Sequence, residues 1–223
     1  MFIIVLILFT LLILLLIQIF FLKKNKKFYK VNEISNTLNN IYYNLENIQK
    51  EVENVQKYEW SDWPEKNLYA NKAKWQIFPF KAFNVVVKEN CQRCPHLTQF
   101  INSVPNVSVA LLSRLGPGMK LHPHKGWGNH SNNVIRCHFG FTVPKGCYVC
   151  VSENGIHEKQ SHQNHQWLCF DDSKTHYAEN PTPYERIVLI LDIKRPSNIQ
   201  KGYSKTQDTK ELYEIIKYYK EKH

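Results

Sequence analysis

Histidine is concentrated in two segments that lie far apart in the chain. The first, LHPHKGWGNH at residues 121–130, holds three histidines, and the second, FDDSKTH, ends on His176. Each segment adjoins a run typical of a β-strand, and the loops at strand ends gather at one mouth of a small barrel. Non-haem Fe(II) chemistry needs two or three fixed imidazoles and open coordination positions. The two segments together therefore indicate a metal site.

A carboxylate often completes such a site, but the position two residues after His124, where it would be sought, holds Gly126. If a co-substrate were a dicarboxylate, a basic side chain deeper in the barrel would also be needed, because a buried carboxylate must be paired. Arg186, at the start of the run RIVLILDI, suits that task. The sequence thus offers the histidines and the cation, and leaves the acid unexplained.

From about residue 58 the chain consists of short apolar runs rich in β-branched residues. The runs are FNVVVK, VSVALLSRL, VIRCHFGFTV, CYVCVS, WLCF and RIVLILDI, and they are separated by GPG, PKG, ENG and NPTP. This spacing predicts a mainly β domain, an antiparallel sandwich or barrel. We also expect a helix near CPHLTQFINSV and an amphipathic helix from about Gln207 to Lys220, within a basic C-terminal segment at residues 201–223.

The first 22 residues, MFIIVLILFTLLILLLIQIFFL, contain no charged side chain. As a helix they would be ~33 Å long, enough to cross a bilayer core of ~30 Å. The run is longer than the apolar region of a signal peptide and no small-x-small cleavage site follows it. We therefore predict a single-pass membrane anchor over residues 1–22. The segment KKNKK follows it, so the positive-inside rule predicts a cytoplasmic domain.

Between the anchor and the first tryptophans, apolar side chains recur at alternating steps of three and four. They are Val31, Ile34, Leu38, Ile41, Leu45, Ile48, Val52 and Val55. A strict 3.5-residue period favours self-association. We predict a basic collar and coiled-coil stalk over residues 23–57, with a homo-oligomer formed through residues 31–57. The alternative is an amphipathic helix packed on the domain behind it, which usually shows a wider apolar stripe.

The formal net charge of +10 includes the lysines that follow the anchor, which suit anionic lipid headgroups. We recognise no nucleic-acid-binding module and expect no nucleic-acid partner.

The six cysteines include CQRC and CYVC, but these lie much further apart than the ~15–20 residues of a zinc ribbon. Strand alternation would also point Cys147 and Cys150 to opposite faces. Buried free thiols are the expectation.

Several motifs occur in an order that resembles the aspartyl/asparaginyl β-hydroxylase family. They are Ser113, GPG, PHKG, RCHFGFTVP, FDDSKTH, Arg186 and DIKRP. The resemblance covers residues from about 58 to 197. It implies a double-stranded β-helix, a cupin-like jelly roll with flanking helices, over residues 58–200. It also implies a dioxygenase that hydroxylates its substrate with Fe(II), 2-oxoglutarate and O2.

The same resemblance implies that His124 and His176 bind the iron. The family looks like a two-histidine variant, with glycine where related oxygenases carry the acid. Water would then take the position beside Gly126, and Asp172 would hold that water.

For the co-substrate, the resemblance implies that Ser113 and Arg186 bind the far carboxylate of 2-oxoglutarate. Arg136 and His138 would contact the carboxylate near the metal. The stretch HYAENPTPYERIVLILDIKRP looks closer to the membrane-bound lipid A hydroxylases than to the peptide hydroxylases. The expected substrate is a protein side chain of the Asp/Asn type or a membrane-proximal lipid acyl chain.

A cupin-like module is the alternative. GPGMKLHPH fits the cupin pattern G-x5-H-x-H, which would add His122 to His124 and His176 as ligands. The glutamate that cupins carry four or five residues later is replaced by Gly128 and Asn129. The alternative function is a membrane-anchored metal- or ligand-binding module without oxygenase activity. The remaining histidines, His130 and His162 among them, are expected in exposed loops.

Overall fold

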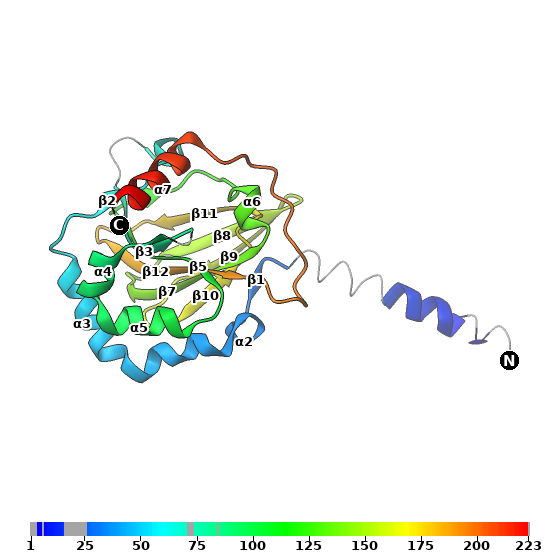
Figure 1. Ribbon diagram of the computed structural model, residues 1–223. Coiled ribbons are helices and arrows are strands. Elements are labelled where there is room, and N and C mark those ends of the chain that lie inside the picture. The colour runs from blue at the N-terminus through cyan, green and yellow to red at the C-terminus, as the bar shows by residue number, and fades with distance from the viewer. Residues whose placement is uncertain (1–3, 6, 16–25, 71–73, 84, 223) are drawn as a thin grey trace.

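Two antiparallel sheets pack face to face in the computed structural model, which describes residues 4–5, 7–15, 26–70, 74–83 and 85–222 (Figure 1). The large sheet holds, in spatial order, β1 (Phe28–Tyr29), β10 (Trp167–Phe170), β7 (Val134–Thr142), β12 (Arg186–Lys194), β5 (Val107–Leu115), β3 (Trp75–Ala82) and β2 (Ser61–Asp62), with β4 (Val85–Val86) paired to β3. The small sheet holds β6 (Met119–Lys120), β11 (Thr175–Asn180), β8 (Tyr148–Glu153) and β9 (Ile156–Ser161). The prediction of a mainly β, antiparallel fold is confirmed.

Helices cover the outer face of the large sheet. The helical elements are α2 (Val31–Ile34), η1 (Asn36–Asn44), α3 (Leu45–Val55), η2 (Lys66–Leu68), α4 (Lys88–Arg93), α5 (Pro95–Ser103), α6 (Gly128–Ser131) and α7 (Lys210–Lys222). In Figure 1, α2, α3 and α5 lie along one side of the large sheet and α7 lies on the opposite side of the domain. The sheet is therefore covered on both faces, one by helices such as α3 and α5 and the other by the small sheet and α7.

This double burial explains why the strands of the large sheet are nearly continuous apolar runs. In β7, the side chains of Ile135, Cys137 and Phe139 join the core under the helices. Those of Arg136 and His138 point between the two sheets. Because side-chain direction alternates along a strand, one face of β7 stabilises the domain and the other is free to build a site.

Residues 31–57 are part of this core. Leu38, Ile41, Ile48 and Val52 are 0–1% exposed and pack with side chains of the large sheet. The predicted stalk is corrected, because the apolar positions face the domain, as in the alternative of a packed amphipathic segment; the oligomer through these residues stays a prediction. The physical reason is that the apolar face of α3 and η1 packs against β7 and α5. A stalk would need that same face for its partner chains.

Polar contacts fix the same segment in place. The Glu51 carboxylate of α3 accepts hydrogen bonds from the backbone N–H groups of His96 and Leu97, both at 2.9 Å, at the start of α5. These donors are among the first N–H groups of a helix, which have no partner inside it. The domain also begins earlier than residue 58, since Phe28 and Tyr29 of β1 pair with β10.

The predicted anchor over residues 1–22 falls partly outside the described residues. Residues 4–5 and 7–15 are helical and carry exposed apolar side chains. Among the residues that the structure describes, none of the helices combines the length and the apolar character needed to cross a bilayer.

We expect Ile48→Ala to lower the free energy of unfolding by about 2–5 kcal/mol, because it removes a fully buried side chain and leaves a cavity. Urea denaturation at two protein concentrations measures this change. Tyr43→Ala in the same segment is the control, because Tyr43 is 88% exposed and should change stability by about 0.5 kcal/mol or less. A loss of stability that disappears at high protein concentration would instead favour an oligomeric role for the segment.

Candidate functional site

His124 and His176 lie directly opposite each other. The backbone N–H of each donates to the carbonyl of the other, at 3.0 and 2.8 Å, in an isolated antiparallel bridge. Opposed residues of such a bridge present their side chains on the same face, and the two ring centroids are 4.4 Å apart. A backbone contact between segments 52 residues apart in the chain therefore brings the two predicted metal ligands together.

The hydrogen bonds of both rings leave the same nitrogen available. Nδ1 of His124 lies 2.8 Å from the carbonyl of His122, and Nδ1 of His176 lies 2.9 Å from that of Lys174. A carbonyl only accepts, so Nδ1 carries the proton and Nε2 keeps its lone pair. Burial lowers the pKa of His124 to about 3 and that of His176 to about 4. Both rings are thus neutral near pH 7, the form that binds metals.

The carboxylate of Asp172 occupies the space that a side chain at position 126 would need. A Cβ built on Gly126 would lie 2.0 Å from Oδ2 of Asp172 and 2.7 Å from Cβ of Ser131. Oδ1 of Asp172 lies 3.4 Å from Nε2 of His176. Position 126 must therefore be glycine, and an acid does lie beside the histidine pair, supplied from residue 172.

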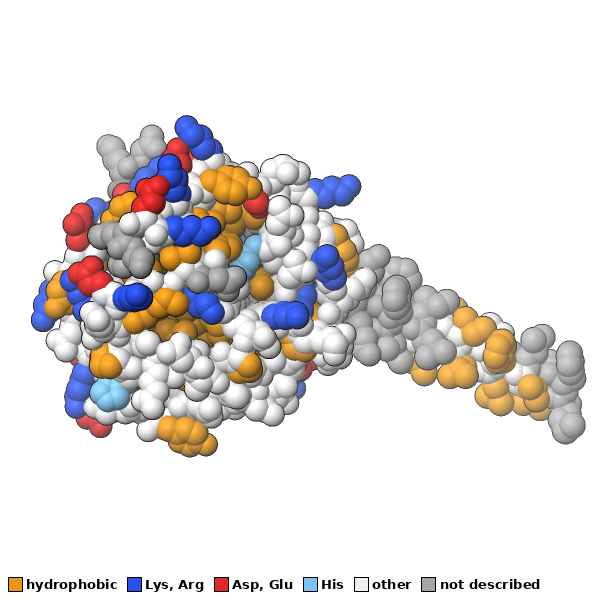
Figure 2. Space-filling model, in the orientation of Figure 1, with side chains coloured by type: hydrophobic (Ala, Val, Ile, Leu, Met, Phe, Trp, Pro, Cys, Tyr) orange, Lys and Arg blue, Asp and Glu red, His pale blue; other side chains and the backbone are white. Residues whose placement is uncertain are grey.

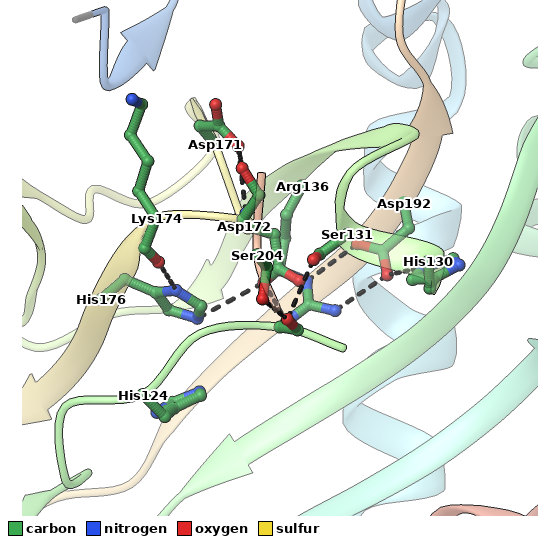
Figure 3. Close-up of polar contacts among 12 residues, drawn as sticks. His124, His130, Ser131, Arg136, Asp171, Asp172, Lys174, His176, Asp192 and Ser204 are labelled. Carbon is green, nitrogen blue, oxygen red and sulfur yellow. Dashed lines mark hydrogen bonds and ion pairs between the residues drawn. The ribbon is translucent and has the colours of Figure 1, made fainter. Parts of the chain in front are cut away.

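Asp172 belongs to a buried ionic network that Figure 3 follows from His176 to His130. Nη1 of Arg136 lies 2.6 Å from Oδ1 of Asp172. The Nε and Nη2 atoms of Arg136 each donate to the Asp192 carboxylate at 2.8 Å. Nε2 of His130 lies 2.9 Å from the same carboxylate. Burial of Asp192 acts to raise the pKa of its carboxyl, but the charge and hydrogen bonds of Arg136 outweigh it and hold that pKa below its usual value. Burial raises the pKa of Asp172, against the attraction of Arg136.

A second cation lies at the deep end of the space between the sheets. Arg186 is 2% exposed, its Nη2 lies 3.5 Å from Oγ of Ser113, and within the described structure its Nε and Nη1 atoms have no hydrogen-bond partner. Burial lowers its pKa to about 10. A buried guanidinium with open donors is costly unless a ligand pairs with it. This is the geometry that a carboxylate would satisfy.

His138 lies beside this cation and stacks on His162, with Nδ1 of His138 3.0 Å from Nε2 of His162 and an angle of 7° between the rings. Among the described residues, Nε2 of His138 has no partner. Burial lowers the pKa of both rings, so they are neutral. His162 was expected in an exposed loop, and the structure instead buries it.

One cavity collects the predicted residues. It is lined by Ser113, His124, Arg136, His138, His176 and Arg186, together with apolar side chains of both sheets. The histidine pair with its open Nε2 atoms, the unpaired donors of Arg186 and the open Nε2 atom of His138 fit a metal ion and a carboxylate-bearing ligand. Among the residues described, no three His, Cys, Asp or Glu side chains converge as a complete metal cage.

The three-histidine cupin set does not form. The His122 ring is exposed, and its Nδ1 lies 2.9 Å from the carbonyl of Asn67, which holds it apart from the pair. Sequence reasoning also missed Asp192 and the half-buried His130. A signal for Asp192 was present, since it is the aspartate of the DIKRP motif inside an otherwise apolar strand.

Comparison with known proteins places this chain in a family. Residues 43–196, more than half of the chain, match the model of the aspartyl/asparaginyl beta-hydroxylase family, and the chain belongs to this family. It is 29% identical over 130 residues to the ornithine lipid ester-linked acyl 2-hydroxylase of Rhizobium tropici, covering 57% of this chain and 44% of that protein. It is 32% identical over 133 residues to aspartate beta-hydroxylase domain-containing protein 2 of Mus musculus, covering 56% and 37%. The chain thus spans less than half the length of these relatives.

Solved structures resemble the chain more loosely. A 2OG-Fe(II) oxygenase family oxidoreductase from Burkholderia pseudomallei aligns with a TM-score of 0.49 at 10% identity, covering 68% of this chain and 80% of that one. A prolyl-4-hydroxylase from Pseudomonas putida aligns with a TM-score of 0.45 at 11% identity, covering 68% and 88%.

We expect Gly126→Ala to lower the free energy of unfolding by about 1–3 kcal/mol, because the added methyl group would overlap Asp172 and Ser131. Thermal and urea denaturation measure the loss. Lys125→Ala, at the exposed neighbouring position, is the control and should be nearly neutral. An unchanged stability in Gly126→Ala would show that Asp172 does not occupy this space.

Proposed function

We propose that this chain is an Fe(II)- and 2-oxoglutarate-dependent hydroxylase that acts on a protein side chain of the Asp/Asn type or on a membrane-proximal lipid acyl chain. The observation that carries the proposal is the pairing of two features in one cavity. His124 and His176 present two neutral imidazoles at one end, and the guanidinium of Arg186 lies buried with open donors at the other. A dicarboxylate that reaches from a metal to a cation matches this arrangement.

The residues take the following roles in the proposal. His124 and His176 hold the iron through Nε2, in the orientation that their Nδ1 hydrogen bonds impose. Arg186, with Ser113, binds the far carboxylate of 2-oxoglutarate. His138 directs its open Nε2 toward the near carboxylate.

Arg136, which the motifs implied at the near carboxylate of 2-oxoglutarate, also has partners within the protein. It lines the cavity, but its guanidinium already pairs with Asp172 and Asp192. We propose that it positions Asp172, whose Oδ1 has no aligned hydrogen-bond donor among the described residues. That oxygen lies 3.4 Å from Nε2 of His176, so it can accept a hydrogen bond from a water molecule held beside the histidine pair.

When bound, iron would supply the activation of O2, of which one oxygen atom enters a substrate C–H bond and the other enters succinate as 2-oxoglutarate loses CO2. The apolar walls of the cavity exclude bulk water, which strengthens the ionic contacts inside it. Fixed hydrogen bonds at both histidines hold their Nε2 atoms in place, so binding requires little reorganisation.

We propose that residues 1–22 anchor the enzyme in a membrane as a single-pass segment, with the catalytic domain on the cytoplasmic side. The uncharged run and the lysines that follow it support this location. The anchor would bring the cavity close to lipid or to membrane proteins.

The first test needs no substrate. Anaerobic titration of the Fe(II)-loaded protein with 2-oxoglutarate should give a visible metal-to-ligand charge-transfer band, because the co-substrate would chelate the metal. We expect His176→Ala and Arg186→Ala to abolish the band, since one removes a metal ligand and the other leaves a buried carboxylate unpaired. Circular dichroism establishes that both variants are folded.

His122→Ala is the matched control for this titration. His122 is exposed and bonded to Asn67, so its loss should leave the band unchanged. A folded, iron-loaded parent without a band would overturn the oxygenase proposal and favour a binding module. Loss of the band in His122→Ala would restore the cupin-like ligand set.

A further inference from the structure

A second pocket lies next to the candidate iron site. Arg136, Trp75 and Ile190 line both this pocket and the cavity that holds the histidine pair. The remaining wall of the pocket is mostly apolar and comes from β3, β5 and β12, with Leu212 and Tyr219 of α7 against it. The space between its walls measures about 590 Å³, a figure that includes open solvent. The two spaces are therefore neighbours that share a wall.

Three tryptophans stack along the pocket. The ring centroids of Trp63 and Trp75 are 4.4 Å apart, those of Trp63 and Trp127 are 6.1 Å apart, and both pairs are tilted by only 12°. Nε1 of Trp63 and of Trp127 donate to the Glu65 carboxylate, and Nε1 of Trp75 donates to Ser113. All three indole N–H groups are bonded, so the tryptophans present no unpaired polar group to the pocket.

The other polar groups of the wall are also paired. Arg136 and Asp192 bind each other through two hydrogen bonds of 2.8 Å, and the hydroxyl of Tyr219 lies 3.4 Å from Oγ of Ser61. A polar side chain of a peptide would lose its hydration here without gaining a partner, which costs free energy. A hydrocarbon chain gains free energy in proportion to the apolar area it removes from water.

We infer that this pocket is the binding site for the hydrocarbon chain of a lipid acyl substrate, lying between α7 and the large sheet next to the cavity that holds the histidine pair. The inference rests on the proposed function and selects the acyl chain from its two substrate classes. On the face drawn in Figure 2, hydrophobic side chains are uncovered beside α7, among both basic and acidic side chains. The apolar opening suits the hydrocarbon part of a lipid.

Photo-crosslinking tests the site directly. The full chain in phosphatidylcholine nanodiscs is irradiated with palmitic acid that carries a diazirine along its chain, and adducts are mapped by peptide mass spectrometry. We expect adducts within residues 74–83, 107–115 and 210–222. Ala82→Phe, which fills the half-buried edge of the pocket, should reduce them about tenfold.

Two controls accompany the experiment. Val86→Phe adds the same side chain at an exposed position of the neighbouring strand β4 and should leave the pocket adducts unchanged. Adducts on residues 4–15 report lipid exposure alone and should be equal in all variants. Pocket adducts that are absent in the parent, or unaffected by Ala82→Phe, would overturn the inference.

The 2-oxoglutarate charge-transfer band, measured on the same preparations, separates the two proposals. A normal band without pocket adducts would reject the acyl site and leave the hydroxylase proposal intact. Pocket adducts without a band would reject the hydroxylase and leave an acyl-binding pocket. Protection of the same peptides by an aspartate-containing peptide, with no acyl adduct, would overturn the inference in favour of a protein substrate.

Discussion

Two carboxylates, those of Asp172 and Asp192, lie fully buried between the sheets because the Arg136 guanidinium lies between them. Burying one such charge alone is prohibitive, and removing one partner of a buried pair typically costs about 3–5 kcal/mol. The contact therefore constrains three elements at once: β7, β12 and the loop before β11. It also forms the wall between the polar cavity and the apolar pocket.

The two spaces on either side of this contact differ in polarity, and the difference has a physical reason. On one side, Arg186 keeps donors that have no partner among the described residues, so the cavity can bind an anion. On the other side, the indole N–H groups of Trp63, Trp75 and Trp127 already have acceptors within the protein. The pocket therefore suits an apolar ligand, which needs no hydrogen-bond donor. A hydroxylation site needs both properties, one for the co-substrate and one for the substrate.

The sequence motifs were a good guide to which residues meet and a poor guide to their contacts. His124 of PHKG and His176 of FDDSKTH line one cavity together with Ser113, Arg136, His138 and Arg186 of the strand runs. The heptad pattern of residues 31–57 misled, because a 3.5-residue period also suits a segment that packs on a sheet. His162 was missed because a single histidine in a polar stretch carries no periodic signal of burial.

The sequence by itself determined the antiparallel strands, the ligand types and the family, since alternation, turn residues and motif order are local properties of the chain. The family resemblance already implied that Asp172 stands near the histidines, but only the tertiary structure decided where its carboxylate lies. Asp172 fills the space above Gly126 because the bridge between His124 and His176 brings the two loops together. Tertiary packing likewise decided that Arg136 pairs with Asp192, a contact between strands 56 residues apart, which depends on strand register rather than on any local pattern.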